Sequence, residues 1–490
     1  MTPGPGGDPA GAGTWETVVG LEVHVQLLTR TKMFCGCSAK YGDPPNTNVC
    51  PVCLGLPGAL PVPNEQAVRL AVRAAYALGC TVHGRSIFAR KNYFYPDLPK
   101  GYQISQFEEP LATGGSLAFV SAERGSVAVR IKRVHLEEDA GKSFHDRVPG
   151  MTAVDFNRSG VPLIEIVSEP DLRSPAEGRA YLTVLKQVLG PGYVAVSNCN
   201  MEEGSLRVDA NLSIRPAGSS ELRTRTEVKN LNSFSGVERA LTAERERQVA
   251  ATERGEAIEQ RTMTFDAASG EVHPMRSKEE SHDYRYFPEP DIPPLVLSEA
   301  WLAKENRELP ELPAVKRERF ERQFTLSSAE SMVVTATAAI ADYFEGMVRA
   351  TGEGSGKEVW NWVANDLLSL SPDGESIPLP VPRAAEVTGL VKAGKLSRQA
   401  AKRVLPEMLE HPAESALAIA ERLGLLQISD TGAIDGWVRE TLETHAAEVA
   451  RYKTGETKLI GFLVGQVMKR SAGKADPKAV NAALAAALKP

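Results

Sequence analysis

The chain has 490 residues and a formal net charge of −6; 42% of its residues are hydrophobic and 24% are charged. This length predicts about two to four globular domains, and no apolar run approaches the roughly 20 residues that cross a bilayer. The acidic balance argues against a protein that binds nucleic acid over its whole surface. Residues 1–13 are rich in glycine and proline and show no secretory signal, so we expect a disordered tail and a cytoplasmic protein.

The first expected strand, at residues 16–27, alternates polar and apolar side chains. Glu22, His24 and Gln26 would share one of its faces, because side chains on a strand alternate. A carboxylate beside an imidazole suits a divalent cation that holds nucleotide phosphates, but a solvated sheet face would produce the same pattern.

Four of the six cysteines lie within nineteen positions, as two short pairs: Cys35, Cys37, Cys50 and Cys53. Such pairs across a loop supply the four soft ligands of a tetrahedral, structural zinc site. Simple buried thiols are the alternative, which we expect for Cys80 and Cys199. A zinc hydrolase is a further hypothesis, but its zinc would need an open position that four cysteine ligands do not leave.

An aromatic segment follows the first helical pattern and is centred on four residues: Tyr93, Phe94, Tyr95 and Tyr102. It is predicted either to line a substrate pocket or to form a tyrosine-rich core loop.

A histidine and three acidic residues then cluster at the end of a strand expected at residues 127–135: His135, Glu137, Glu138 and Asp139. Adjacent carboxylates repel one another unless a cation or water screens them. The Gly141-Lys142-Ser143 sequence that follows is not a P-loop, because Leu136 stands where its first glycine would be required.

Two further expected strands, with neighbouring segments, carry the remaining candidates: Glu165, Glu203, Arg207 and Asp209, with Lys91 and Arg158 as additional cations. A lone glutamate such as Glu165 is usually only a salt-bridge partner. Taken together, however, strands that present acids and cations on one face could hold Mg²⁺-ATP and stabilise a transferring phosphoryl group.

Helical patterns are interleaved with these strands and dominate the chain beyond the proline-rich residues 287–295. Ser174 before Pro175 and Asp476 before Pro477 are typical of helix N-termini. We therefore expect an α+β domain over residues 14–296, a helical domain over 297–410 and a helical tail over 411–490. From position 446 onward eight basic residues stand against three acidic ones, which indicates either a nucleic-acid contact or a solvated helix face.

The blocks that carry these candidates resemble those of the B subunits of bacterial aspartyl/glutamyl-tRNA amidotransferases. Seven occur in order between Glu16 and Leu295 and one lies in the tail: ETVVGLEVHVQL, KNYFYPDLPKGYQISQF, HLEEDAGKS, DFNRSGVPLIEIVSEPD, MEEGSLRVDANLSIRP, EVKNLNSF, DYRYFPEPDIPPL and GFLVGQVMK. The similarity covers nearly the full length of the chain.

The resemblance implies a cradle-like α+β domain of the glutamine synthetase/guanido kinase type, followed by all-α helical and tail domains. It implies that ATP phosphorylates the side-chain carboxylate of misacylated Glu-tRNA(Gln) or Asp-tRNA(Asn), and that ammonia then displaces the phosphate. An amidase A subunit would release the ammonia from glutamine, and a small C subunit would tie the other two together. No glutaminase set of cysteine, histidine and acid is visible in this sequence, in agreement with that division. A non-catalytic tRNA-docking scaffold is the alternative that the basic tail and helical half suggest.

Carried onto this chain, the family roles fall on residues already singled out. The implied Mg²⁺ ligands are Glu22, His24 and Glu138, with Glu137, Glu203 and Asp209 as further candidates. Lys91 and Arg207 would contact phosphate. The zinc of Cys35, Cys37, Cys50 and Cys53 would support folding and not the reaction, and Lys469, Arg470 and Lys474 would contact the tRNA.

Overall fold

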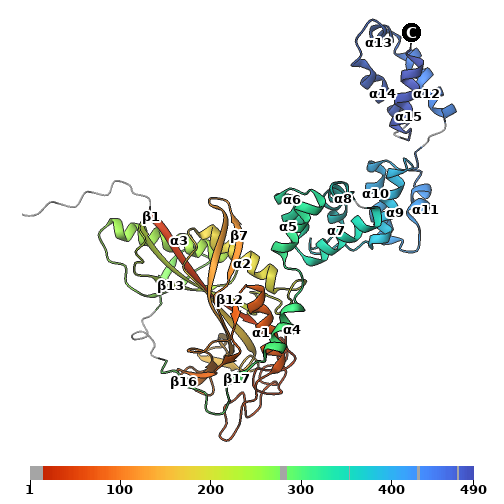
Figure 1. The fold of residues 1–490 in the computed structure, drawn as a ribbon. Helices are drawn as coiled ribbons and strands as arrows, with labels where there is room; N and C mark the ends of the chain where they lie inside the picture. The colour runs from red at the N-terminus through yellow and green to blue at the C-terminus, as the bar shows by residue number, and fades with distance from the viewer. Residues whose placement is uncertain (1–14, 276–283, 353, 428–430, 472–473, 490) are drawn as a thin grey trace, which may run out of the picture. The chain divides into compact units, whose positions relative to one another are not determined.

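The computed structural model describes residues 15–275, 284–352, 354–427, 431–471 and 474–489; the tail expected at residues 1–13 lies outside this part. The chain divides into two compact units, residues 1–314 and 315–490 (Figure 1). Among the described helices, none combines the length and the apolar character needed to cross a membrane. The three-domain division expected from the sequence stays a prediction.

A ten-stranded sheet forms the centre of the first unit. Its strands lie in the order β15 (Val272–Pro274), β14 (Thr262–Phe265), β13 (Thr226–Leu231), β12 (Leu206–Pro216), β1 (Trp15–Gln26), β11 (Pro162–Ser168), β8 (Gly125–Glu138), β6 (Ala112–Thr113) and β2 (Thr81–Val82), with β7 (Ser116–Ser121) beside β8. All neighbours are antiparallel except β13 and β14, which are parallel. The strand nearest the N-terminus is therefore central and is flanked by strands far away in sequence.

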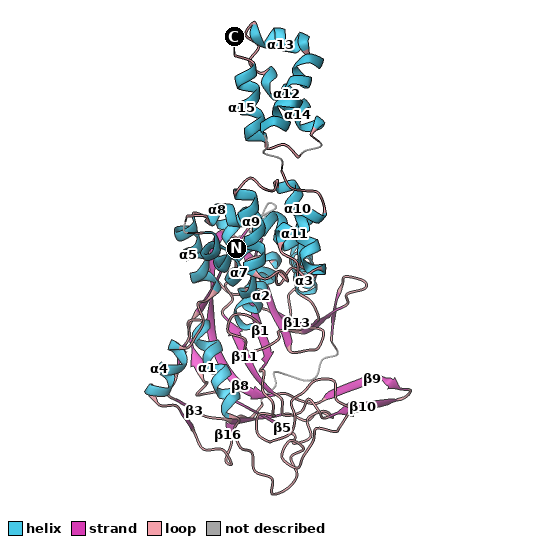
Figure 2. Cartoon of the chain, turned by 90° about the vertical axis from the view of Figure 1, so that its right-hand side faces the viewer, coloured by secondary structure: helices cyan, strands magenta, loops and turns pink. Residues whose placement is uncertain are grey.

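Three smaller sheets complete the described strands of this unit. They consist of β9 (Lys142–Val148) with β10 (Met151–Asp155), of β16 (Phe287–Pro288), β4 (Ala89–Asn92) and β5 (Tyr102–Ser105), and of β17 (Leu295–Val296) with β3 (Arg85–Ser86). The β9–β10 hairpin projects to one side (Figure 2). The proline-rich segment therefore contributes two short strands, β16 and β17, to the first unit.

The large sheet has two different faces. Its apolar face is defined by side chains of β1, β11 and β12 that are at most 2% exposed: Leu21, Val23, Val25, Ile164, Ile166, Val208 and Ala210. They share one hydrophobic core with α1 (Glu65–Ala77), α2 (Pro175–Leu189), α3 (Phe234–Glu253) and α4 (Glu299–Arg307). Alternate residues point the other way and define the polar face: Glu22, His24, Gln26, His135, Glu137, Glu165, Arg207 and Asp209.

Helices make up the regular structure of the second unit. They are α5 (Pro313–Phe324), α6 (Ser328–Val334), α7 (Ala338–Thr351), α8 (Gly356–Trp362), the short π and 3₁₀ turns η1 (Val363–Leu367) and η2 (Leu368–Leu370), α9 (Val381–Lys392), α10 (Arg398–Glu410), α11 (Ala416–Arg422), α12 (Thr431–Thr444), α13 (Ala446–Lys453), α14 (Leu459–Arg470) and α15 (Pro477–Ala487). One core spans α5 to α11 and a separate, smaller one spans α12 to α15. The α+β class with C-terminal helices is thus confirmed.

Two helix starts expected from the sequence are confirmed at the level of single atoms. The Ser174 side chain accepts a hydrogen bond from the backbone N–H of Glu177, and Pro175 opens α2. Asp476 caps α15 in the same way by accepting from the N–H of Lys478, with Pro477 in the first turn. Each cap satisfies a backbone donor that the helix itself cannot.

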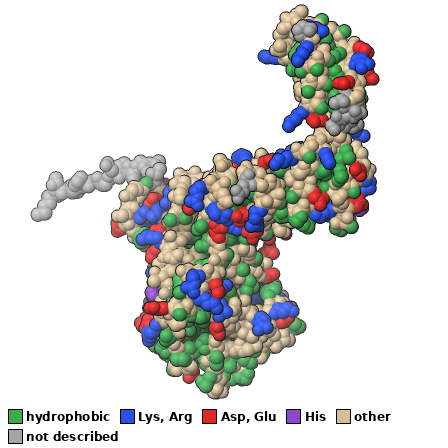
Figure 3. All heavy atoms as spheres, turned by 45° about the vertical axis from the view of Figure 1, so that its right-hand side comes forward, with side chains coloured by type: hydrophobic (Ala, Val, Ile, Leu, Met, Phe, Trp, Pro, Cys, Tyr) green, Lys and Arg blue, Asp and Glu red, His purple; other side chains and the backbone are tan. Residues whose placement is uncertain are grey.

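Hydrophobic side chains gather at the lower end of the first unit in the space-filling view (Figure 3). The loop between β1 and α1, which carries the four clustered cysteines, exposes several large ones: Tyr41, Leu56, Leu60 and Val62. Where such side chains form a continuous patch, they mark a surface that binds another molecule.

Candidate active site

A row of charged and polar side chains crosses four neighbouring strands on the polar face. In the sheet register His24 lies opposite Arg207 of β12 and opposite Glu165 of β11, and Glu165 lies opposite His135 of β8. Directly opposed residues of an antiparallel pair point to the same side, with their Cβ atoms about 5 Å apart. The register therefore gathers residues that are up to 183 positions apart in the sequence.

Three of these side chains form a candidate cation site. His24 Nε2 lies 3.5 Å from a carboxylate oxygen of Glu137 and 3.5 Å from one of Glu165. One ligand atom from each of the three lies within 4.8 Å of the others. His135 stands behind both carboxylates, with Nε2 3.3 Å from Glu165 and 3.7 Å from Glu137. The Ser105 hydroxyl donates a hydrogen bond to Glu137 at 3.2 Å.

The two carboxyls stay ionised although they are buried. Burial by itself raises the pKa of a carboxyl. The neighbouring His135, together with His24, nevertheless holds the pKa of Glu137 below its ordinary value and that of Glu165 well below it. Burial would lower the pKa of His135, but the same two carboxylates raise it to about 9. Negative charge is therefore kept at this point of the sheet.

The donor set fits a hard divalent cation. The two carboxylate oxygens are donors that Mg²⁺ prefers, and the imidazole nitrogen is the softer donor of the three. Mg²⁺ bonds of about 2.1 Å would place ligand atoms about 3 to 4 Å apart. The separations found here lie close to that range. Binding through His24 Nε2 would require a neutral imidazole, so cation binding would compete with a proton.

Glu22 lies next to this cluster on the same face of β1. Its carboxylate accepts a hydrogen bond from Asn211 Nδ2 at 3.1 Å. Burial raises its pKa, and so do the charges of Glu165, Glu227 and Asp209. The charge of His24 lowers this pKa by a smaller amount, and a bound cation would add to that positive charge.

Arg207 is the cation next to His24, and it is held by Asp139. One guanidinium nitrogen of Arg207 donates to Asp139 Oδ1 at 2.9 Å, while Gln26 Nε2 donates to Oδ2 at 2.8 Å. Arg158 Nε lies 3.7 Å from the same carboxylate. Asp139, which is buried, thus fixes the position of Arg207 on the polar face.

Lys91 approaches the site from β4. Burial would lower its pKa, but Glu137 is the first of several neighbours that raise it above its ordinary value. Its Nζ also lies 4.8 Å from the centre of the Tyr284 ring. Tyr286 packs edge-on against Tyr284 and stacks on Phe107, with the ring centres of Tyr286 and Phe107 4.2 Å apart. These rings form an aromatic wall beside Lys91. Lys91 therefore combines a charge near the two glutamates with an apolar surround.

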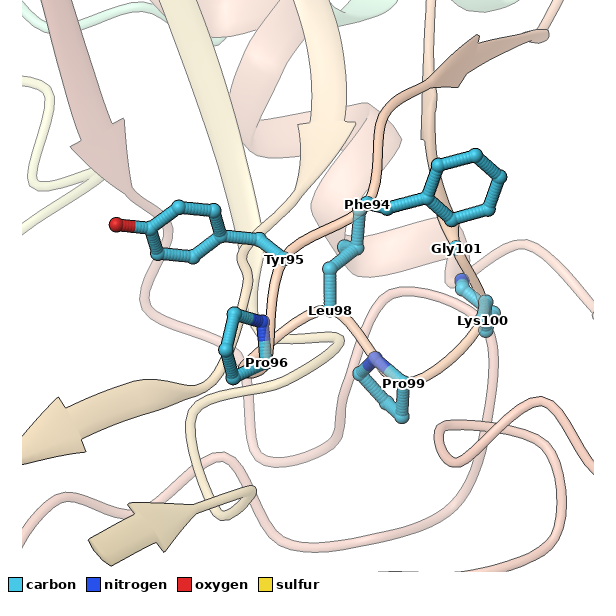
Figure 4. Close-up of a pocket in the computed structure, with 7 residues that line it drawn as sticks. All are labelled: Phe94, Tyr95, Pro96, Leu98, Pro99, Lys100 and Gly101. Atoms are coloured by element: carbon cyan, nitrogen blue, oxygen red, sulfur yellow. The ribbon is translucent and has the colours of Figure 1, made fainter. Parts of the chain in front are cut away.

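The aromatic segment that follows β4 lies partly beside Lys91 and partly at the surface. Tyr93 packs edge-on against Tyr284 at 6.0 Å, close to Lys91. Phe94, by contrast, is 91% exposed. Figure 4 shows that the side chains of Phe94 and Tyr95 point to opposite sides of the loop that ends at Gly101, where these residues line an open pocket.

Glu138 is not brought into the cluster. It follows Glu137 on β8, and because successive side chains alternate, it points to the opposite side of the sheet. There its carboxylate pairs with Lys100 Nζ and accepts a hydrogen bond from the Ile104 N–H at 3.0 Å. The structure thus separates Glu138 from His24. Glu165 instead lies beside His24, at the ligand position that the sequence had suggested for Glu138.

The two other candidate acids also lie outside the cluster. Asp209 is on the polar face, but its carboxylate pairs with Lys229 Nζ at 3.0 Å. Glu203 lies in the loop before β12, where it accepts a hydrogen bond from Asn198 Nδ2 at 3.0 Å.

The four clustered cysteines converge as the spacing predicted. Their sulfurs lie within 4.8 Å of one another, with Cys50 and Cys53 Sγ 3.9 Å apart. A tetrahedral zinc with bonds of about 2.3 Å would hold its sulfurs about 3.8 Å apart. The donor set and geometry fit that ion, with all four positions filled by protein.

The basic candidates of the tail lie at and beyond the end of α14. Arg470 is already bound within the unit, since it donates to Glu440 at 3.0 Å and to the Thr444 hydroxyl at 2.7 Å. Lys469 is exposed in the last turn of the helix, and Lys474 is exposed in the loop that follows.

Sequence reasoning gave too little weight to Glu165 and passed over Ser105. Glu165 stands alone among apolar residues of its strand, so its role appears only once the register places it between His24 and His135. Ser105 lies in a short strand with no distinctive pattern. A polar residue in an otherwise apolar central strand was the available signal for Glu165.

The chain is similar to known proteins over nearly its whole length. Residues 17–303 match the GatB/GatE catalytic domain and residues 342–488 match the GatB domain. Curated relatives include proteins of Thermodesulfovibrio yellowstonii (50% identical; 95% of this chain, 98% of the relative), Prosthecochloris aestuarii (48%; 96% and 97%) and Moorella thermoacetica (49%; 95% and 98%). Each of these relatives is named as the B subunit of an aspartyl/glutamyl-tRNA(Asn/Gln) amidotransferase.

Proposed function

Because the chain belongs to the family of aspartyl/glutamyl-tRNA(Asn/Gln) amidotransferase B subunits, we propose that its polar face carries the ATP-dependent step of tRNA amidation. The chain is a subunit of a ligase that converts Glu-tRNA(Gln) or Asp-tRNA(Asn) to the amide form. In the proposed reaction the γ-phosphoryl group of ATP moves to the side-chain carboxylate of the misacylated tRNA. Ammonia then attacks the acyl carbon and phosphate leaves.

The observation that carries this proposal is the His24, Glu137 and Glu165 cluster with Arg207 beside it on adjacent strands. Two buried carboxylates and an imidazole at one point of a sheet cost stability, so a functional reason for them is required. A nucleotide polyphosphate with its cation supplies that reason.

Mg²⁺ would be held by His24, Glu137 and Glu165, with Glu22 next to it, and when bound it would supply neutralising charge to the phosphates. Arg207, fixed by Asp139, would bind phosphate oxygens through its guanidinium group. Lys91 would stabilise the charge that develops during transfer, because its ammonium faces the same two glutamates from another strand. Asp209, opposite Glu22 on the polar face, and Glu203, in the loop before β12, would contact the nucleotide from the edge of this site.

The aromatic wall of Tyr93, Phe107, Tyr284 and Tyr286 would limit the access of water to the acyl phosphate. An acyl phosphate hydrolyses when water reaches it, so its amidation requires a dry site. A carboxylate by itself is a poor acceptor for ammonia, and phosphorylation converts its oxygen to a good leaving group.

The architecture and the second metal belong to the same proposal. We assign the first unit to the cradle-like fold of glutamine synthetase and guanido kinases, with the polar face as the inside of the cradle. The cysteine cluster would hold a structural Zn²⁺, since its four thiols leave no position for water.

The proposed assembly contains two further subunits. An amidase A subunit would release ammonia from glutamine, and a small C subunit would tie the amidase to this chain in a cytoplasmic complex. The helical tail from residue 411 would hold the tRNA, with Lys469, Arg470 and Lys474 as phosphate contacts. The exposed apolar loop of the first unit fits a chain that works in such a complex.

The proposal is tested with Glu22→Ala in the assembled enzyme. Amide formation from ATP, ammonia and misacylated tRNA should be lost, whereas glutamine hydrolysis should stay measurable. Glu16→Ala is the matched control. Glu16 lies on the same strand but outside the cluster, and its carboxylate lies 2.6 Å from Arg215 Nε. Undiminished amide formation by Glu22→Ala would refute the assignment and favour a tRNA-docking scaffold, for which deletion of the tail alone would abolish activity.

A further inference from the structure

Lys32 is a fully buried lysine between the cysteine cluster and the segment that precedes β11. Its Nζ donates to the Asn48 carbonyl at 2.7 Å, to the Phe156 carbonyl at 3.2 Å and to Cys53 Sγ at 3.6 Å. An ammonium has three donors, and each of them finds an acceptor here. A buried charge needs such partners, so this side chain holds three parts of the chain to one point.

On one side Lys32 faces the sulfur of a proposed metal ligand. Four thiolates around one divalent ion leave a net charge of −2. An ammonium against Cys53 Sγ offsets part of that charge and stabilises the loaded cluster. Without the metal the four sulfurs are no longer held to one point, so the ammonium has a less firmly placed partner at Cys53.

On the other side Lys32 holds residues 156–160. The Ser159 hydroxyl donates to the Cys53 carbonyl at 3.2 Å, and the Met33 N–H donates to the Gly160 carbonyl at 2.7 Å. Gly160 has a φ of +85°, and a Cβ there would lie 3.4 Å from both Lys32 Cδ and Cys53 Cβ. The segment therefore packs directly on the cysteine cluster, with little space between them.

The same segment reaches the polar face through Asp139. The Gly160 N–H donates to the Asp139 carbonyl at 2.8 Å, and the Asp139 N–H donates to the Val161 carbonyl at 2.8 Å. The side chain of Asp139 in turn holds Arg207 at 2.9 Å. A continuous series of contacts thus leads from Cys53 to Arg207.

We propose that Lys32 is a positioning residue that couples metal occupancy of the cysteine cluster to the placement of Asp139 and Arg207. The zinc site would then support the phosphate-binding residues themselves, and not only the fold of its own loop. The coupling is a property of this chain, whereas its effect on ATP use rests on the function proposed above.

The coupling is tested by hydrogen exchange of the full-length protein, with Zn²⁺ and after its removal by a chelator. In the wild type, loss of the metal should lower the protection of the Asp139 and Gly160 amides about 10-fold or more. In Lys32→Met these amides should exchange rapidly whether or not Zn²⁺ is present. Lys40→Met is the matched control, since Lys40 lies in the same loop, is 76% exposed and pairs only with Asp43 among the described contacts.

Unchanged protection in the wild type after metal removal would overturn the coupling, even if Lys32→Met does not fold. An equal response to Zn²⁺ in the wild type and in Lys32→Met would overturn the role of Lys32. A milder variant, Ser159→Ala, should reduce the response by a smaller factor, because it removes a single hydrogen bond to the cluster.

The KM for ATP, measured in the assembled enzyme, distinguishes a failure of this inference from a failure of the proposed function. Lys32→Met should raise the KM for ATP several-fold while glutamine hydrolysis keeps its rate. Altered exchange with an unaltered KM for ATP would uphold the coupling and contradict the phosphate-binding role proposed for Arg207.

Discussion

The polar and apolar faces of the large sheet are built from the same strands, yet they carry opposite kinds of side chain. On the apolar face Val23 and Ile166 are fully buried against helices. One residue further along the same strands, Glu22, His24 and Glu165 point the other way. The first set stabilises the sheet by removing apolar surface from water, whereas the second places charges where burial is costly.

A single step along a strand therefore changes the role of a residue. Glu137 and Glu138 are chemically identical neighbours at the end of β8. Glu137 joins the candidate cation site, while Glu138 pairs with Lys100 on the other side of the sheet. Substitutions on the two faces should therefore separate activity from stability.

The largest effect should follow from His24→Ala on the polar face. Loss of an imidazole from the cation site removes several kcal/mol of stabilisation of the transferring phosphoryl group, so amide formation should fall by about 1000-fold. The melting temperature should change by only a few degrees. The assay uses ammonia as the nitrogen donor, with His83→Ala as control because His83 bonds Thr113 at the edge of the sheet. Equal losses in the two variants would contradict a special role of His24 in the reaction.

On the apolar face, Ile166→Ala should mainly reduce stability. Its side chain is fully buried opposite Val23 and Val134, and the cavity should lower the free energy of unfolding by about 3 kcal/mol. Denaturant unfolding measures this value, and Val120→Ala, at a 60% exposed position of β7, should cost less than about 0.5 kcal/mol. If the folded Ile166→Ala enzyme lost amide formation as severely as His24→Ala, the two faces would not be functionally distinct.

Glu137→Gln and Glu138→Gln test the two faces of the sheet at adjacent positions. Glu137→Gln should slow amide formation about 100-fold and raise the Mg²⁺ concentration required, because it removes one negative ligand. Glu138→Gln should instead lower the free energy of unfolding by about 1 to 2 kcal/mol through its weakened contact with Lys100. A greater loss of rate in Glu138→Gln would restore the ligand role that the sequence suggested for Glu138.

The smallest effect on activity should follow from changes to basic residues of the helical tail, which belongs to neither face of the sheet. Reversal of Lys469 and Lys474 to glutamate should raise the KM for the tRNA about 3- to 10-fold and reduce its dependence on salt, because fewer phosphates would be neutralised. Arg470 is also a proposed phosphate contact, but it is left intact because it bonds Glu440 within the unit, so its replacement would change stability as well as tRNA binding. Lys392→Glu, at an exposed position of α9, serves as control. A salt dependence equal to that of the wild type would contradict a phosphate contact at these lysines.

Much of this organisation could be predicted from residue patterns. Alternation at Glu22 and His24 identified the polar face, and the cysteine spacing identified a loop that gathers four sulfurs. A change of hydrophobic period located the helical part of the chain. These features are local, so they can be recognised without knowledge of strand pairing.

The remainder depends on which strands become neighbours. Nothing near Glu165 in the sequence indicates that it lies opposite His24. The divergence of Glu137 and Glu138 requires the register at the end of β8. Lys32 is an isolated lysine in a loop, and its burial appears only in three dimensions.

The central position of β1 also has a consequence for the order of folding during synthesis. β1 ends at Gln26, but its partner β12 ends at Pro216, so the pairing waits until about 190 further residues have been made. At about 5 to 20 residues per second this takes roughly 10 to 40 s. During that time a strand rich in valine has at least one unpaired edge, because its other partner β11 ends earlier, at Ser168. Slow translation of this region should therefore favour aggregation or the binding of chaperones.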